Sequence, residues 1–173
     1  RSIGAELVLF VGIFAVTAWL TATQSPHSLA VGQQAQADSP QGNSQMQVTS
    51  AWAPTLPGSS GTGSAYMTLT NLQQQDDRLI AASSPWSEAV TLHRTATDGQ
   101  MTGMADIDGL LVPAGADVTL EPGGYHLMFT GLYASFAAGD LVPMTLTFER
   151  AGPIDILLTV RSLDEATESL HRH

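Results

Sequence analysis

Two histidines and two methionines are spaced so that together they could bind one soft metal ion. His93 is followed by Met104, and then by His126 and Met128, in the pattern H-x10-M-x21-H-x-M. Imidazole nitrogen suits copper, zinc, iron and nickel, whereas the soft, uncharged thioether of methionine selects Cu(I). Because the ligand set carries no negative charge, it favours Cu(I) over Cu(II). The sequence therefore predicts a Cu(I) site without a thiolate, in a chain that has no cysteine.

The residues around both histidines indicate strands that present them on one face. In residues 125–129, apolar positions alternate with His126 and Met128. A strand has a side-chain period of two, so the apolar residues would face the core and these two side chains the opposite side. Residues 90–93 alternate in the same way, and His93 is therefore also expected to face away from the core.

Short alternating runs separated by turn signals fill the chain from Met46 onward. Turn clusters such as Asp98-Gly99 and Pro122-Gly123-Gly124 separate the runs. This spacing indicates an all-β fold, either an antiparallel sandwich or a barrel, with no helix of normal length inside the domain. We expect strands at residues 47–52, 63–69, 78–83, 88–94, 118–120, 125–130, 144–148 and 154–160.

The position of Met104 indicates a hairpin. It follows the Asp98-Gly99 turn signal and precedes Ile107, which places it on or beside a short strand. The four ligands would thus come from a strand end, a hairpin and a third strand, near the surface of the domain. Met101, three residues earlier, is an auxiliary candidate that could exchange with Met104.

The other methionines and the large aromatic residues have a simpler interpretation. Methionine in a strand most often fills a core, and a single histidine in a sheet is usually just hydrogen-bonded. The joint spacing of the four candidate ligands is what favours a metal site over this alternative. We interpret the other methionines and the large aromatic residues as packing residues: Met46, Met67, Met144, Trp52, Tyr66 and Trp86.

Several blocks of the chain resemble the PCu(A)C family of periplasmic copper chaperones. The family signature of His, Met and His-x-Met is matched at His93, Met104, His126 and Met128. The resemblance spans about residues 46–162 and implies a cupredoxin-like β-sandwich. It includes the blocks Ala51-Trp52-Ala53, Gly63-Ser64-Ala65-Tyr66-Met67-Thr68-Leu69-Thr70-Asn71, Pro122-Gly123-Gly124-Tyr125-His126-Leu127-Met128 and Val142-Pro143-Met144-Thr145-Leu146-Thr147-Phe148.

Composition excludes several functions. The formal net charge is −10, with 16 acidic residues against 6 basic ones, so no basic patch is available for nucleic acid. The sequence offers no nucleophile and base pair, phosphate loop or zinc spacing, and we expect no enzymatic activity. A blue-copper electron carrier needs a cysteine thiolate with two histidines, which this chain cannot supply.

The ends of the chain are read as appendages to one domain. Residues 1–23 form an N-terminal membrane anchor or signal segment, in which residues 7–23 would enter the membrane as a hydrophobic helix. A flexible linker follows at residues 24–45, then the copper-binding sandwich at 46–162 and a polar tail at 163–173. Arg1 before the apolar stretch places the folded domain on the periplasmic face of the inner membrane, and cleavage to a soluble periplasmic protein is the alternative.

The resemblance implies a metallochaperone that delivers Cu(I) by ligand exchange. The expected acceptor is the binuclear copper centre in subunit II of cytochrome c oxidase, or another membrane copper protein, with a thioredoxin-like assembly factor as a further partner. Two alternatives stay open. The chain could be a membrane-anchored accessory subunit of a respiratory or copper-enzyme complex, or it could be a periplasmic copper buffer.

Overall fold

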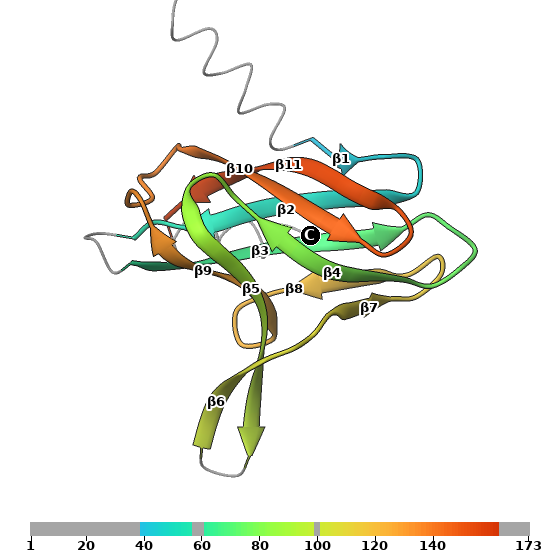
Figure 1. Ribbon diagram of the computed structural model, residues 1–173, viewed down its shortest axis with the longest axis horizontal. Coiled ribbons are helices and arrows are strands. Elements are labelled where there is room, and N and C mark those ends of the chain that lie inside the picture. Colours follow the sequence, from blue (N-terminus) through green and yellow to red (C-terminus); the bar gives the residue numbers. More distant parts are fainter. Residues whose placement is uncertain (1–38, 57–60, 99–100, 163–173) are drawn as a thin grey trace, which may run out of the picture.

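The computed structural model describes residues 39–56, 61–98 and 101–162, with the side chains of 96–102 left out (Figure 1). This part of the chain is all β, without a helix, as the sequence predicts. Every strand expected from the alternation is present. The strands are Gln41–Gly42 (β1), Met46–Pro54 (β2), Thr62–Asn71 (β3), Asp77–Ser83 (β4), Ser87–Asp98 (β5), Met101–Asp106 (β6), Leu110–Val112 (β7), Asp117–Leu120 (β8), Tyr125–Leu132 (β9), Leu141–Phe148 (β10) and Gly152–Arg161 (β11).

Strand pairing closes the domain into a flattened, barrel-like sandwich. The order runs β2, β11, β10, β4, β5, β9 and β3, and β3 pairs with β2 again. All of these pairs are antiparallel except β11 with β2, which is parallel. Within the described part of the chain, β6 pairs only with β5, and this hairpin extends from the barrel (Figure 1). A strand of the barrel wall therefore continues outward and carries β6 with it.

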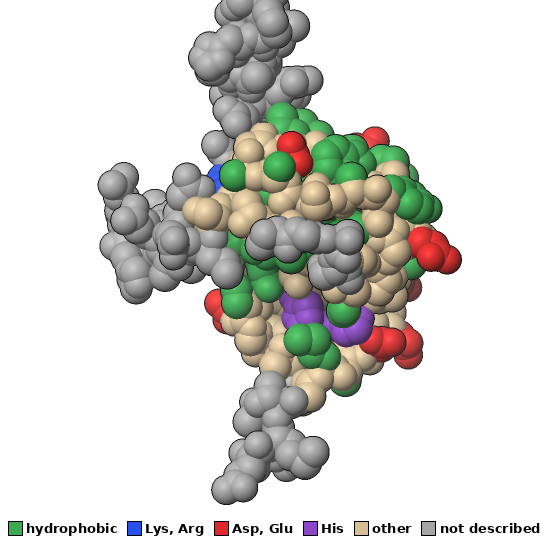
Figure 2. Space-filling model, turned by 90° about the vertical axis from the view of Figure 1, so that its left-hand side faces the viewer, with side chains coloured by type: hydrophobic (Ala, Val, Ile, Leu, Met, Phe, Trp, Pro, Cys, Tyr) green, Lys and Arg blue, Asp and Glu red, His purple; other side chains and the backbone are tan. Residues whose placement is uncertain are grey.

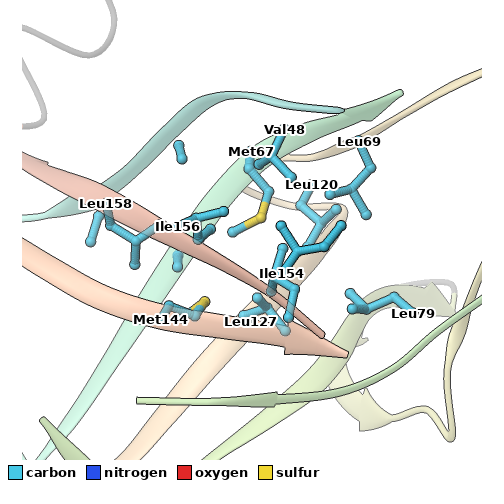
Figure 3. Packing of buried hydrophobic residues seen from close by; sticks show 14 of the residues in the cluster. Val48, Met67, Leu69, Leu79, Leu120, Leu127, Met144, Ile154, Ile156 and Leu158 are labelled. Atoms are coloured by element: carbon cyan, nitrogen blue, oxygen red, sulfur yellow. The ribbon is translucent and has the colours of Figure 1, made fainter. Parts of the chain in front are cut away.

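The core lies inside the barrel and is built largely from alternate residues of the long strands β2, β3, β9, β10 and β11. In β3, for example, Ala65, Met67 and Leu69 are at most 2% exposed, while the intervening residues are half-buried. Figure 3 shows Met67 and Met144 among leucine, isoleucine and valine side chains from several strands. Their packing role is confirmed, and it leaves these thioethers inside the barrel.

A bulge in β2 changes which residues reach the outer face. Ser50 has a positive φ of 52°, and the register of β2 against β3 shifts between Thr49 and Trp52. Before the bulge Val48 is buried, and after it Ala51 is buried, so one extra residue has been inserted into the alternation. Trp52 is thereby moved to the outer face, opposite Tyr66 of β3.

The folded domain begins before the resemblance does. β1 lies inside the stretch expected as a linker and pairs with β2. The Gln41 side-chain amide donates to the Leu157 carbonyl at 2.9 Å, and its oxygen accepts from the Leu157 N–H. Residues 1–23 and 163–173 lie outside the described residues. Within the described residues, no helix long and apolar enough to cross a membrane is found.

Candidate metal centre

His93 and His126 lie directly opposite each other on neighbouring antiparallel strands. His93 of β5 is the register partner of His126 of β9. Their rings are stacked, with centroids 5.7 Å apart and planes 29° apart. Figure 2 shows the two described histidines side by side at the surface, with hydrophobic and acidic side chains next to them. Residues 33 positions apart in sequence are thus brought together by one strand pair.

The His126 ring is held by the backbone of the preceding turn. Its neighbours Leu127 and Phe129 are fully buried in the core, so His126 lies on the other face, as the alternation predicts. His126 is nonetheless only 4% exposed, because the His93 and Tyr66 rings flank it. Nδ1 lies 3.2 Å from the Gly124 carbonyl oxygen. Since a carbonyl only accepts, Nδ1 carries the proton and Nε2 keeps its lone pair.

His93 is oriented through its other nitrogen. Nε2 lies 3.1 Å from an Asp106 carboxylate oxygen and 2.7 Å from the Thr91 hydroxyl. A carboxylate accepts, so the proton belongs on Nε2 and the lone pair on Nδ1. That Nδ1 is buried and has no hydrogen-bond partner among the described residues. A second group that accepts from the protonated nitrogen fixes the tautomer and ring direction of a metal-binding histidine.

The two candidate thioethers flank this pair on the same face. Met128 is half-buried and lies two residues from His126, so both share a face of β9. Its register partners are Ser64 of β3 and Thr91 of β5. Met104 pairs with Thr95, and since Thr95 lies two residues beyond His93, the register places Met104 on the face of the histidines.

The hairpin leaves Met104 accessible. Its side chain is 66% exposed, the highest exposure among the four candidates. Met101 pairs with Asp98 at the end of the hairpin, and its side chain lies outside the described part. The Met104 thioether can therefore be reached from solvent by a metal ion or by another protein.

An aromatic row continues from the histidines across the outer face. The Tyr66 ring lies 6.5 Å from the His126 ring, and the Trp52 ring lies 4.9 Å from Tyr66. From their place in the sequence, Trp52 and Tyr66 are predicted only to be packing residues. The alternation of β3 predicts that Tyr66 points outward. In β2 the bulge at Ser50 shifts the alternation, so the sequence pattern does not predict that Trp52 points outward.

The arrangement suits a soft cation better than a hard one. Two neutral imidazoles supply lone pairs, and the nearest same-face candidates are neutral thioethers. In the described part of the chain, no group of three or more His, Cys, Asp or Glu side chains could hold a metal ion. Among residues 39–56, 61–98 and 101–162, the carboxylate paired with these histidines is that of Asp106, which lies against the protonated side of His93.

Comparison with known proteins places the domain in a family. A family model described as putative lipoprotein LpqE-like matches residues 46–160. A putative lipoprotein of Leifsonia xyli is 30% identical over 125 residues, covering 72% of this chain and 74% of that protein.

Solved structures have the same fold. The copper-bound PCuAC domain of PmoF2 superposes with a TM-score of 0.63 at 24% identity, covering 72% of this chain and 98% of that domain. The solution structure of Cu(I)-DR1885 from Deinococcus radiodurans has a TM-score of 0.56 at 26% identity, covering 81% of this chain and 95% of that one. The resemblance to PCu(A)C domains is thus confirmed. By its sequence, the chain belongs to the LpqE-like family of putative lipoproteins.

Proposed function

We propose that this protein is a Cu(I) metallochaperone whose cargo is bound by His93, Met104, His126 and Met128. The observation that carries the proposal is the stacked histidine pair. Each ring is held through one nitrogen by an accepting oxygen, and each keeps a lone pair on the other. The two thioethers on the same face complete a neutral donor set that matches Cu(I).

The exposure of the four side chains supports transfer by ligand exchange. His126 is 4% exposed and would hold its ring fixed, whereas Met104 is 66% exposed on a hairpin with one strand neighbour. A sulfur or nitrogen atom of the acceptor can replace the Met104 thioether first, while the other three proposed ligands still hold the ion. The copper-bound and Cu(I)-bound states of the related structures support the choice of cargo.

We further propose that the domain works outside the cytoplasm, at the periplasmic face of the inner membrane. The lipoprotein description of the family and of its Leifsonia xyli member supports a location outside the cytoplasm. Residues 7–23 would supply the membrane anchor. An anchored donor and a membrane-bound acceptor share one surface, which raises their effective concentration. The acceptor we propose is the subunit II copper centre of cytochrome c oxidase, with a thioredoxin-like assembly factor as a further partner.

Transfer to that acceptor can be tested directly. The Cu(I)-loaded chain is mixed anaerobically with the copper-free soluble domain of oxidase subunit II, the two proteins are separated, and the copper in each is measured. We expect most of the copper to move to the acceptor, faster than from a small-molecule Cu(I) complex at the same free copper concentration. Copper that stays with this chain would contradict delivery and leave buffering as the function.

A further inference from the structure

A groove lies beside the histidine pair, where β4 and β5 diverge. The two strands are joined at one register pair, Ala82 with Val90. Beyond it, β6 takes the place of β4 along this edge of β5, from His93 onward, and the Ile107 N–H donates to the Leu92 carbonyl at 3.0 Å. The opposite edge of β5 pairs with β9. The space enclosed between β4 and this connection measures about 370 Å³. This volume is at the lower end of the range of small-molecule pockets, about 300–1,000 Å³.

The groove combines an apolar floor with an acidic rim. Leu79 and Leu127 form part of the floor and are at most 1% exposed, and Ile80 at the rim is 47% exposed. Asp106 and Asp108 also line it, and both are exposed. The whole chain carries a net charge of −10, so an incoming basic segment would be attracted from a distance.

The wall of the groove also offers free strand edge. β4 pairs with β7 up to Leu79 and with β5 at Ala82. On this side of β4, Ile80 and Ala81 have no register partner within the described residues. The opposite side of β4 is covered by β10, with a register shift at Ile80. An extended peptide can add to such an edge through backbone hydrogen bonds, with alternate side chains directed to opposite sides.

Asp106 connects the groove to the candidate metal centre. The same carboxylate that lines the groove lies 3.1 Å from Nε2 of His93. It orients the imidazole, and a carboxylate in this position also makes the ring a stronger ligand. A cationic side chain that pairs with Asp106 would draw the carboxylate away from His93. Occupation of the groove would therefore weaken the hold of His93 on a bound ion.

We infer that this groove docks an extended basic segment of the copper acceptor, and that docking promotes release through Asp106. Apolar side chains of the segment would lie on the leucine floor, and its lysines or arginines would reach Asp106 and Asp108. The identity of the partner as an acceptor rests on the proposed function. The docking itself is a property of the copper-free protein and can be measured without metal.

The test uses a capped pentapeptide of alternating lysine and valine, titrated into the 15N-labelled full chain. We expect saturable shifts of the amide signals of Ala81, Leu92 and Ile107. Asp108→Asn and Ile80→Ser should each weaken binding about fivefold, as for a single exposed charge or contact. The matched control is Asp117→Asn, which removes the same charge from an exposed position on β8. Equal effects of Asp108→Asn and Asp117→Asn would contradict binding in the groove, because the affinity for the peptide would then depend on net charge alone.

Copper release gives a separate readout. Peptide at a concentration near its wild-type dissociation constant should raise the rate of Cu(I) loss to a chelator clearly more in the wild type than in Ile80→Ser, which itself should bind Cu(I) normally. Peptide binding with an unchanged rate would overturn the coupling through Asp106. A chain that binds the peptide but no Cu(I) would refute the proposed function while leaving the groove established, so the two failures are distinguishable.

Discussion

Replacing His126 by asparagine should lower Cu(I) affinity at least about 100-fold, a loss beyond that of removing an outer-shell partner. His126 supplies the imidazole that is held most firmly, because Gly124 fixes Nδ1 and two rings flank it. The variant should still fold, with its free energy of unfolding lowered by about 1–2 kcal/mol. The side chain lies outside the hydrophobic cluster, and the Gly124 carbonyl still accepts from the Thr95 N–H. Competition with a chromogenic Cu(I) chelator measures the affinity, and urea denaturation measures the stability.

The methionines provide a matched pair for the same experiment. Met128→Leu and Met67→Leu each replace a thioether by a side chain of similar volume on neighbouring strands, β9 and β3. Met128 faces the histidines, whereas Met67 is 2% exposed inside the barrel. We expect a large loss of Cu(I) affinity only for Met128→Leu, and a stability change below about 1.5 kcal/mol for both. Equal affinities of the two variants would exclude Met128 from the site.

Asp77→Asn should destabilise the domain by about 3 kcal/mol, among the largest effects of any single polar substitution. The carboxylate is 2% exposed. One oxygen accepts from the Arg78 and Arg150 N–H groups at 2.7 and 2.9 Å. The other accepts from the Ala151 N–H at 2.9 Å and the Gln73 amide at 3.1 Å. An asparagine would place its N–H₂ group against one of these two pairs of N–H donors. The turn between β10 and β11 would then lose hydrogen bonds that hold it to residue 77.

The pH dependence of stability should identify the same carboxylate. Burial raises the pKa of Asp77, but the hydrogen bonds from Arg150, Ala151, Arg78 and Gln73 together outweigh it and lower the pKa below the ordinary value of 3.8. A lowered pKa means that the folded state favours the charged form. The stabilisation is therefore complete well above pH 3.8 and is lost as the pH falls through the lower folded value.

Urea denaturation at neutral and acidic pH checks this account. The stability difference between wild type and Asp77→Asn should be largest near neutral pH and shrink on acidification. The neighbouring exposed Asp76 accepts one hydrogen bond, from the Ala114 N–H, and Asp76→Asn should cost less than about 1 kcal/mol. A similar cost for both variants would show that the buried network is not the source of the effect.

The sequence predicts most of the fold because apolar and polar residues alternate clearly along the long strands. In residues 125–129, Leu127 and Phe129 are buried and Tyr125 packs half-buried against the core, while the histidine and methionine lie on the other face. The period of two needs no knowledge of the partner strands. By contrast, β1 and β7 have two and three residues, too few to show a period. β1 pairs with the nearby β2, whereas the pairing of β7 depends on β4, which is distant in sequence.

The surroundings of the histidines were harder to predict, for two physical reasons. Trp52 reaches the outer face only because the bulge at Ser50 shifts the alternation by one residue. Asp106 contacts His93 through the register of β5 against β6, which depends on where the hairpin turns. The bulge and the position of the hairpin turn are both local backbone conformations, and the pattern of residue types does not reveal them.

X-ray absorption of the full chain loaded anaerobically with one equivalent of Cu(I) tests the central claim most directly. We predict scattering from both nitrogen and sulfur, as two imidazoles and two thioethers require. Met104→Leu should reduce the sulfur component, whereas Met101→Leu should leave it unchanged. A spectrum without sulfur scattering, or a chain that takes up no copper in competition with a chelator, would contradict a site built from His93, Met104, His126 and Met128.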